Sequence, residues 1–285
     1  MFLRDFIKRI IPDAIYLKLK FKKEMGRSLN LKNPLTFNEK LQWLKLYNRN
    51  PLYTTLVDKY AVKQYMSKLI GEQYIIPTLG VWENFEDIDF DKLPNQFVLK
   101  CTHDSGSYVV CRDKSKLNID EARKKLATAL KRNYYYPGRE WPYKNVPPRI
   151  IAEQYIEDRN GALIDYKFSC FDGYVDCVMA CLDRHLNDTK FYFFDKEWNL
   201  KRLNIRGKNA PADFSIPKPS CMDQMFDIAA KLSEKIPYVR VDLFECDGKI
   251  YFGEMTFYPD SGFDANLLPE TDKYFGQLID LSKIS

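Results

Sequence analysis

The chain has 285 residues, 45% hydrophobic and 29% charged, which is the composition of a soluble globular protein large enough for one large domain or two to three subdomains. Its 44 basic and 39 acidic side chains leave a net charge of +5, which suits an anionic ligand but is too small and too dispersed to indicate nucleic-acid binding. Seven cysteines without a Cys-x-x-Cys pair and only two histidines argue against a disulfide framework and a zinc site. No apolar run reaches the ~20 residues of a membrane span, and the N-terminal residues lack the pattern of a signal peptide. These features predict a cytoplasmic location.

Residues 2–25 have the pattern of a basic amphipathic helix that is interrupted at Pro12. Such a helix could rest on an anionic membrane surface, which would place the protein at the inner face of the membrane. Packing of this helix against the rest of the protein is the favoured interpretation.

Two further helices are predicted before residue 70. Thr36 and Glu39 have the spacing of a capping box, so a helix is expected to begin there. A second helix is expected from about residue 51 through residue 69, and it contains an Asp-Lys pair that ends in Lys59. On composition alone, Lys59 would be one of several solvated lysines on a helix face.

A short buried strand is predicted at residues 97–101, and it carries Lys100 directly into the Gly/Ser loop at Ser105, Gly106 and Ser107. A lysine on a buried strand needs an anionic partner, and the backbone N–H groups of such a loop can cradle a phosphate. A plain β-turn would explain the loop equally well but would leave Lys100 unexplained.

A second buried strand is predicted at residues 149–156, with Glu153 near its end. Residues 166–170 and 174–182 are expected to pair as a hairpin about an Asp-Gly turn. Residues 187–219 predict hairpins and loops without recognisable chemistry, and an amphipathic helix is expected at residues 222–236.

Residues 240–256 alternate apolar and polar side chains on either side of another Asp-Gly turn, which predicts a β-hairpin. Asp242 and Glu254 lie on its two strands, so the two carboxylates can meet across the ladder and hold a hard cation such as Mg²⁺. Arg240 shares the strand face of Asp242, and a fixed guanidinium beside a cation suits phosphoryl transfer. The alternative is that both acids face solvent. Two carboxylates held close are expected to repel each other when no cation lies between them, so replacing either acid should leave the metal-free protein equally stable or slightly more stable.

This stretch resembles the metal-binding end of the ATP-grasp enzymes. D-alanine:D-alanine ligase and the ribosomal-protein glutamate ligase carry Arg-x-Asp, a hairpin, then Glu-x-Asn and a Pro-Gly loop. Over roughly residues 55–265 the chain is similar to the TupA-like (teichuronopeptide-biosynthesis) branch, which is found among genes for bacterial surface polysaccharides. Thr256 stands where most of the superfamily has a metal-binding Asn, so the geometry of any second Mg²⁺ is in question.

The resemblance implies an α+β ATP-grasp fold, in which two α+β subdomains grip ATP. On this basis the expected division is a helical N-terminal region at residues 1–72, a subdomain with the phosphate-binding loop at 73–155, and a C-terminal subdomain with the metal site at 156–285.

The resemblance also implies a role for each candidate residue. The nucleotide phosphates would be contacted by Lys59, Lys100, Ser105, Gly106 and Ser107. The adenine would lie at Glu153, Gln154 and Ile156, the ribose at Asp165, and Lys167 would take the place of a basic residue of the glutamate-ligase relatives. Mg²⁺ would be held by Asp242, Glu254 and Thr256, and the catalytic arginines would be Arg240 and Arg184.

The implied reaction is ATP-dependent ligation of a carboxylate to an amine through an acyl phosphate, with release of ADP. The implied substrates are a uronic-acid carboxyl of a surface polysaccharide or its precursor, and an amino acid or another amine. Two alternatives stay open. An Asp-x-Asp triplet at Asp87 and Asp89 could indicate a glycosyltransferase, although it lies in a polar connector and three-residue matches of this kind are common by chance. The ATP-grasp fold also admits a phosphotransferase or a catalytically silent binding module.

Overall fold

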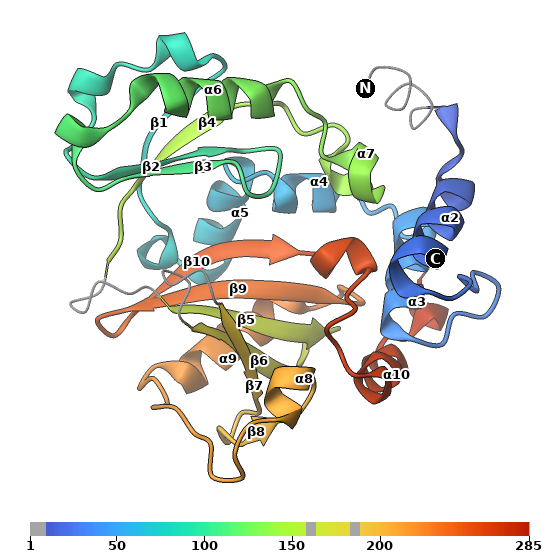
Figure 1. The fold of residues 1–285 in the computed structure, drawn as a ribbon. Helices are drawn as coiled ribbons and strands as arrows, with labels where there is room; N and C mark the ends of the chain where they lie inside the picture. Colours follow the sequence, from blue (N-terminus) through green and yellow to red (C-terminus); the bar gives the residue numbers. More distant parts are fainter. Residues whose placement is uncertain (1–9, 158–163, 183–188, 285) are drawn as a thin grey trace. The chain divides into compact units, whose positions relative to one another are not determined.

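The computed structural model describes residues 10–157, 164–182 and 189–284. Contacts divide the chain into two units, one formed by residues 51–161 and the other by residues 1–50 together with 162–285. Figure 1 shows helices and two separate sheets in the described residues, and both sheets are antiparallel throughout.

The unit formed by residues 51–161 contains a four-stranded sheet in the order β1-β4-β2-β3. The strands are β1 (Thr78–Trp82), β2 (Phe97–Cys101), β3 (Tyr108–Cys111) and β4 (Ile150–Gln154), and the helices are α4 (Leu52–Val57), α5 (Ala61–Ile70), α6 (Ile119–Leu130) and α7 (Tyr135–Gly138). Helix α6 is amphipathic: its apolar face buries Leu126 against Leu99 and Ile150 of the sheet, and its other face is charged. The predicted strand at residues 97–101 is confirmed.

The helix predicted from about residue 51 through 69 is wrong as a single element, because the chain breaks between α4 and α5. Asp58 leaves the helical conformation at ψ 110°, and its carboxylate accepts the backbone N–H of Tyr60 at 2.9 Å. A side chain that takes local backbone donors in this way competes with the helix for them. Lys59 therefore lies in the break and not on a helix face.

The other unit contains a six-stranded sheet in the order β10-β9-β5-β6-β7-β8. Its strands are β5 (Ile164–Phe171), β6 (Tyr174–Leu182), β7 (Lys190–Phe194), β8 (Leu200–Lys201), β9 (Val239–Cys246) and β10 (Lys249–Thr256). Helix α8 (Ile205–Lys208) follows β8, and helix α9 (Met222–Ser233) packs on β5, where the rings of Phe168 and Phe226 meet edge-on at 5.1 Å.

Both predicted hairpins of this unit are confirmed. Each turn has an Asp and a Gly with positive φ: 51° and 86° at Asp172 and Gly173, and 49° and 79° at Asp247 and Gly248. Two successive residues with positive φ are characteristic of the type I′ turn, which matches the twist of the strands it joins.

Helices α2 (Asp13–Met25), α3 (Phe37–Tyr47) and α10 (Pro269–Leu278) belong to the same unit. Thr36 and Glu39 form the predicted capping box at the start of α3. Helix α2 begins after Pro12 and buries Leu17 and Phe21, whose ring lies 6.2 Å from that of Phe263. Membrane contact by this segment stays a prediction. Within the described residues, no helix combines the length and apolar character that crossing a membrane requires.

Candidate functional site

In the unit formed by residues 51–161, Glu153 of β4 lies between two lysines. The Nζ atom of Lys63 is 2.5 Å from Oε1, and that of Lys100 is 2.6 Å from Oε2. Burial favours the protonated form of Glu153, which is 5% exposed, but the two ammonium groups outweigh burial and hold the pKa of this carboxyl below its usual value. Burial in turn lowers the pKa of Lys63, against the pull of Glu153. The anionic partner that a lysine on a buried strand requires is therefore supplied by Glu153.

The sequence did not single out Lys63. The sequence feature that could have identified Lys63 is its position directly after Val62 on an amphipathic helix, four residues after Lys59. The other two residues predicted at the end of β4 have no comparable pairing: Gln154 is exposed and donates its backbone N–H to the carbonyl of Pro77 at 3.0 Å, and Ile156 is half-buried beyond the strand.

The predicted Gly/Ser loop and Lys59 lie together. The backbone N–H of Lys59 donates to the carbonyl of Thr102 at 3.1 Å, and its ammonium donates to the backbone carbonyl of Asp104. Ser107 donates its hydroxyl to the Asp104 carboxylate, while Ser105 and Gly106 are exposed at the tip. The sequence thus identified two segments, distant along the chain, that the fold brings into contact.

Two buried polar residues of this loop were missed by sequence reasoning. His103 and Asp104 are 2% and 5% exposed, and within the described residues Nδ1 of His103 and Oδ1 of Asp104 have no hydrogen-bond partner. Burial raises the pKa of Asp104, and the hydroxyl of Ser107 and the charge of Lys59 offset this only in part. The available signal was a His-Asp pair directly before the Gly/Ser loop.

In the other unit, the predicted metal ligand Asp242 is engaged by two cations. Arg240 places Nε 2.7 Å from Oδ1 and Nη2 2.8 Å from Oδ2, and Lys167 donates to Oδ2 from the neighbouring strand. Burial raises the pKa of Asp242, but Arg240 and Lys167 outweigh it, so this pKa lies below its usual value. Lys167 also pairs with Asp165 at 2.6 Å, so the predicted ribose contact and the predicted metal ligand share one lysine.

Glu254 lies opposite Asp242 in the ladder, as predicted. The register shifts at Gly253, where a Cβ atom would come within 2.9 Å of the Asp242 carbonyl oxygen, so a glycine is needed at this irregularity. The Glu254 side chain is 37% exposed, with Nη2 of Arg240 at 3.5 Å and the hydroxyl of Thr256 at 3.4 Å. The expected repulsion between the two acids is wrong, because Arg240 contacts both of them.

This oxygen donor set fits Mg²⁺ in its chemistry. Glu254 has only long contacts, at 3.4 Å and 3.5 Å, and the Thr256 hydroxyl accepts a hydrogen bond from Nη2 of Arg240 at 3.2 Å, while both oxygens of Asp242 already accept hydrogen bonds from cations. Oδ2 of Asp242 accepts both Arg240 and Lys167, whereas Oδ1 accepts Arg240 alone and keeps a second lone pair through which Asp242 could bind a metal. In the part of the chain that the structure describes, no cluster of three or more His, Cys, Asp or Glu side chains is arranged to hold a metal.

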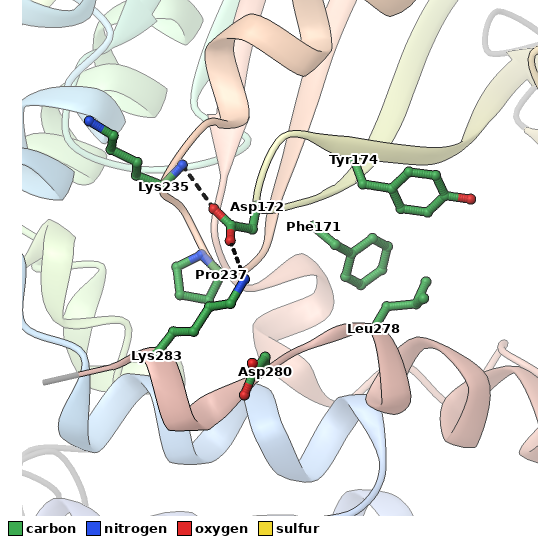
Figure 2. Close-up of a pocket in the computed structure, with 8 residues that line it drawn as sticks. All are labelled: Phe171, Asp172, Tyr174, Lys235, Pro237, Leu278, Asp280 and Lys283. Carbon is green, nitrogen blue, oxygen red and sulfur yellow. Dashed lines mark hydrogen bonds and ion pairs between the residues drawn. The ribbon is translucent and has the colours of Figure 1, made fainter.

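Arg184, the second predicted catalytic arginine, lies outside the described residues. A surface pocket of about 490 Å³ in the same unit as Arg240 contains none of the predicted site residues. Figure 2 shows Asp172 in this pocket, where it pairs with Lys283 at 2.9 Å and accepts the backbone N–H of Lys235 at 3.1 Å. Its carboxylate is therefore satisfied by the protein itself.

The class of protein is α+β, with two antiparallel sheets and flanking helices. It carries an ATP-grasp pattern, in which a strand lysine leads into a Gly/Ser loop and an Arg-x-Asp hairpin follows later in the chain. Residues 39–280 match the family model described as TupA-like ATPgrasp. The chain belongs to the TupA-like ATP-grasp family, so the expected family and fold class are confirmed.

Several solved ATP-grasp ligases are similar to this chain. D-alanine–D-alanine ligase from Bacillus anthracis, complexed with ATP, is 18% identical with a TM-score of 0.46, over 93% of this chain and 70% of that one. The enzyme of the same name from Helicobacter pylori is 16% identical with a TM-score of 0.43, over 86% and 69%. ATP-grasp ligase PsnB, in a complex with a precursor variant, Mg and ADP, is 12% identical with a TM-score of 0.45, over 87% and 66%. No curated protein matches the chain.

Proposed function

We propose that this protein is an ATP-dependent ligase that joins a carboxylate to an amine and releases ADP and phosphate. The observation that carries the proposal is the ion cluster of Arg240, Asp242 and Lys167, in which Asp242 and Lys167 are buried and Arg240 is partly buried. This cluster lies beside Glu254 and Thr256 of the β9–β10 hairpin. Such a cluster provides fixed positive charge next to oxygen donors suited to a cation, which phosphoryl transfer requires.

In the proposed reaction, an oxygen of the substrate carboxylate attacks the γ-phosphorus of ATP, and the bond to the ADP oxygen breaks. The amine nitrogen then attacks the acyl carbon, loses a proton, and inorganic phosphate leaves. Mg²⁺ held by Asp242, Glu254 and Thr256 would neutralise the charge of the triphosphate and of the leaving ADP.

The chain's own residues divide the remaining work. Lys100 and Lys59, with the loop of Ser105, Gly106 and Ser107, would bind the phosphates. Glu153, Gln154 and Ile156 would contact adenine. Each oxygen of Glu153 accepts one lysine and keeps a second lone pair for this purpose.

Residues of the other unit would stabilise the charge that develops in the reaction and would bind the ribose. Arg240 would stabilise the oxyanion of the tetrahedral adduct, since its Nη1 takes part in neither bond to Asp242. Arg184 would act on the phosphates or the substrate, and Asp165 and Lys167 would hold the ribose side of the nucleotide.

The proposed carboxylate is a uronic acid of a bacterial surface polysaccharide or its precursor, and the proposed amine is an amino acid or another amine. The family branch supports this choice by analogy. The proposed location is the cytoplasm, where ATP is available.

The glycosyltransferase alternative loses its motivating observation. Asp89 caps a short turn by accepting the backbone N–H of Asp91 at 3.1 Å, and it pairs with Lys92 at 3.0 Å. Ile88 between the two acids is buried, so the Asp-x-Asp triplet has a local structural role.

The deciding experiment traps the acyl phosphate with hydroxylamine, a small nucleophile that requires no amine-recognition pocket. With Mg-ATP, hydroxylamine and a panel of uronic acids, we expect a hydroxamate and an equal amount of ADP for the correct acid. Release of AMP and pyrophosphate would indicate an acyl adenylate and would overturn the proposal. ADP with a phosphorylated product and no hydroxamate would indicate a phosphotransferase instead.

A further inference from the structure

One face of helix α3 buries polar side chains where an apolar stripe would be usual. Asn38, Gln42 and Lys45 follow the helical spacing of four and three residues, and they are 0%, 0% and 1% exposed. Burying amide and ammonium groups costs free energy unless they are hydrogen-bonded, so this face is expected to serve a particular partner.

The partner is the segment that follows β10. Nε2 of Gln42 donates to the carbonyl oxygens of Gly262 at 2.5 Å and Ser261 at 3.2 Å. Nζ of Lys45 donates to the same Ser261 carbonyl at 2.6 Å and to Oε1 of Gln42 at 3.0 Å. Asn38 completes the set, because its Oδ1 accepts the backbone N–H of Asp264 at 2.8 Å.

The segment held in this way has an unfavourable backbone conformation. Asp260, Ser261 and Gly262 have φ values of 47°, 53° and 64°, so three successive residues have a backbone conformation in the left-handed region. This conformation costs roughly 1–2 kcal/mol for each residue with a Cβ atom. Asp260 and Ser261 therefore need external support, and strain of this kind is found mainly at functional positions.

The strained turn lies directly beyond the proposed cation ligands. Thr256 ends β10, and Asp260 follows four residues later. Tyr258 and Phe263 on either side of the turn pack their rings 5.5 Å and 4.9 Å from Nζ of Lys45. A shift of the turn would therefore move the end of β10 and its side chains.

We propose that Gln42 and Lys45 are positioning residues for the reaction: they impose the left-handed turn at residues 260–262 and thereby fix the strand end that carries Glu254 and Thr256. This inference rests on the proposed ligase function. Helix α3, which precedes both sheets in the chain, would thereby help to set the geometry of the site.

The main test compares two lysines on the same helix. Lys45→Met removes the ammonium that holds the turn, whereas Lys40→Met removes one that donates to the carbonyl of Ile279 at 2.7 Å, away from the turn. We expect Lys45→Met to lower kcat for hydroxamate formation by about 10- to 100-fold, since small misplacements of reacting groups have effects of this size. Lys40→Met should keep the wild-type kcat. Both variants are assayed well below their melting temperatures.

A second test uses the strain itself. Ser261→Gly allows the left-handed conformation without a Cβ penalty, so Lys45→Met should cost much less kcat in that background than in the wild type. Hydrogen exchange of the protein without substrate provides a readout that needs no activity: in Lys45→Met and Gln42→Leu, amide protection at residues 260–264 should fall, while protection in β9 is kept.

The proposal is wrong if Lys45→Met exchanges faster at residues 260–264 but keeps the wild-type kcat. It is also wrong if the loss of kcat is the same with and without Ser261→Gly, because the lysine would then act on something other than the strained turn. Failure of the ligase function appears differently, as a wild type that yields no hydroxamate while the exchange results stand.

Discussion

Arg240 binds Asp242, two residues further along the same strand, through two nitrogen atoms at 2.7 Å and 2.8 Å. The acid that the sequence assigned to the metal is therefore already paired with a guanidinium whose side chain is 17% exposed. This pairing outweighs the lowering effect of desolvation, so the pKa of Arg240 lies above its usual value. This relationship separates two carboxylates that otherwise look equivalent, and it determines how each should respond to substitution.

Replacement of Asp242 should destabilise the protein even without a metal. Asp242→Asn removes the anion shared by the buried Lys167 and the partly buried Arg240, and loss of one partner of a buried pair costs about 3–5 kcal/mol. Glu254→Gln is the matched control, since its side chain is 37% exposed and its contact with Arg240 is long, at 3.5 Å. It should change stability by less than about 1 kcal/mol.

Urea unfolding of the metal-free variants measures both effects. Both substitutions should abolish activity if both acids bind the cation. Equal stability of Asp242→Asn and the wild type would mean that the pairing with Arg240 contributes little.

Removal of Lys100 should weaken Mg-ATP binding by about 1.5–3 kcal/mol, the range for charge-assisted hydrogen bonds. The control is Lys114→Ala, in the same unit, whose ammonium donates to the carbonyls of Phe90 and Leu93. Calorimetric titration with Mg-ATP should distinguish the two variants. Unchanged affinity of Lys100→Ala would assign this lysine to Glu153 alone.

The stability contributed by Glu153 should disappear in acid. Because Lys100 and Lys63 hold its pKa below the usual value, the unfolded chain binds the proton more tightly than the folded one. The contribution is therefore complete above the unfolded pKa of about 4.3 and is lost as the pH falls through the folded pKa. Unfolding free energies measured from pH 6 to pH 3 should decline more steeply for the wild type than for Glu153→Gln, and parallel curves would refute the assignment.

Asp104 should oppose nucleotide binding. The carboxylate of Asp104 accepts a hydrogen bond from the Ser107 hydroxyl, and its backbone carbonyl accepts one from the Lys59 ammonium. Two groups proposed to donate hydrogen bonds to phosphate are therefore engaged by Asp104 when no nucleotide is bound. Burial already raises its pKa, and a nearby triphosphate would raise it further, so ATP should bind together with a proton. Calorimetry in buffers of different ionisation enthalpy should detect this uptake in the wild type and not in Asp104→Asn, which should bind Mg-ATP more tightly. Proton-independent binding by the wild type would contradict this role.

Alternation and turn chemistry were sufficient to predict the two Asp-Gly hairpins and the opposition of Asp242 and Glu254, because these depend on neighbours along the chain. The break at Asp58 was missed because helical periodicity continues across it, while the carboxylate that ends α4 is also held by Arg149, which lies 91 residues away. The cross-strand partners of Lys100 and Asp242, which are Glu153 and Lys167, were missed for a related reason: a sequence indicates that a buried charge needs a partner, but only the strand register selects which residue of the neighbouring strand it is.

The order of the chain also bears on how the protein is made. Residues 51–161 form a continuous unit within a discontinuous one, and the polar face of α3 binds groups that lie 216 to 234 residues later. During synthesis the interior unit can complete its own contacts while Asn38, Gln42 and Lys45 still lack theirs, because domains generally fold as units as they emerge. The same helix packs Phe37 against Tyr238 and Phe275, so a chain that ends before these residues would also expose apolar surface of α3. Exposed hydrophobic surface makes such an incomplete chain prone to aggregate.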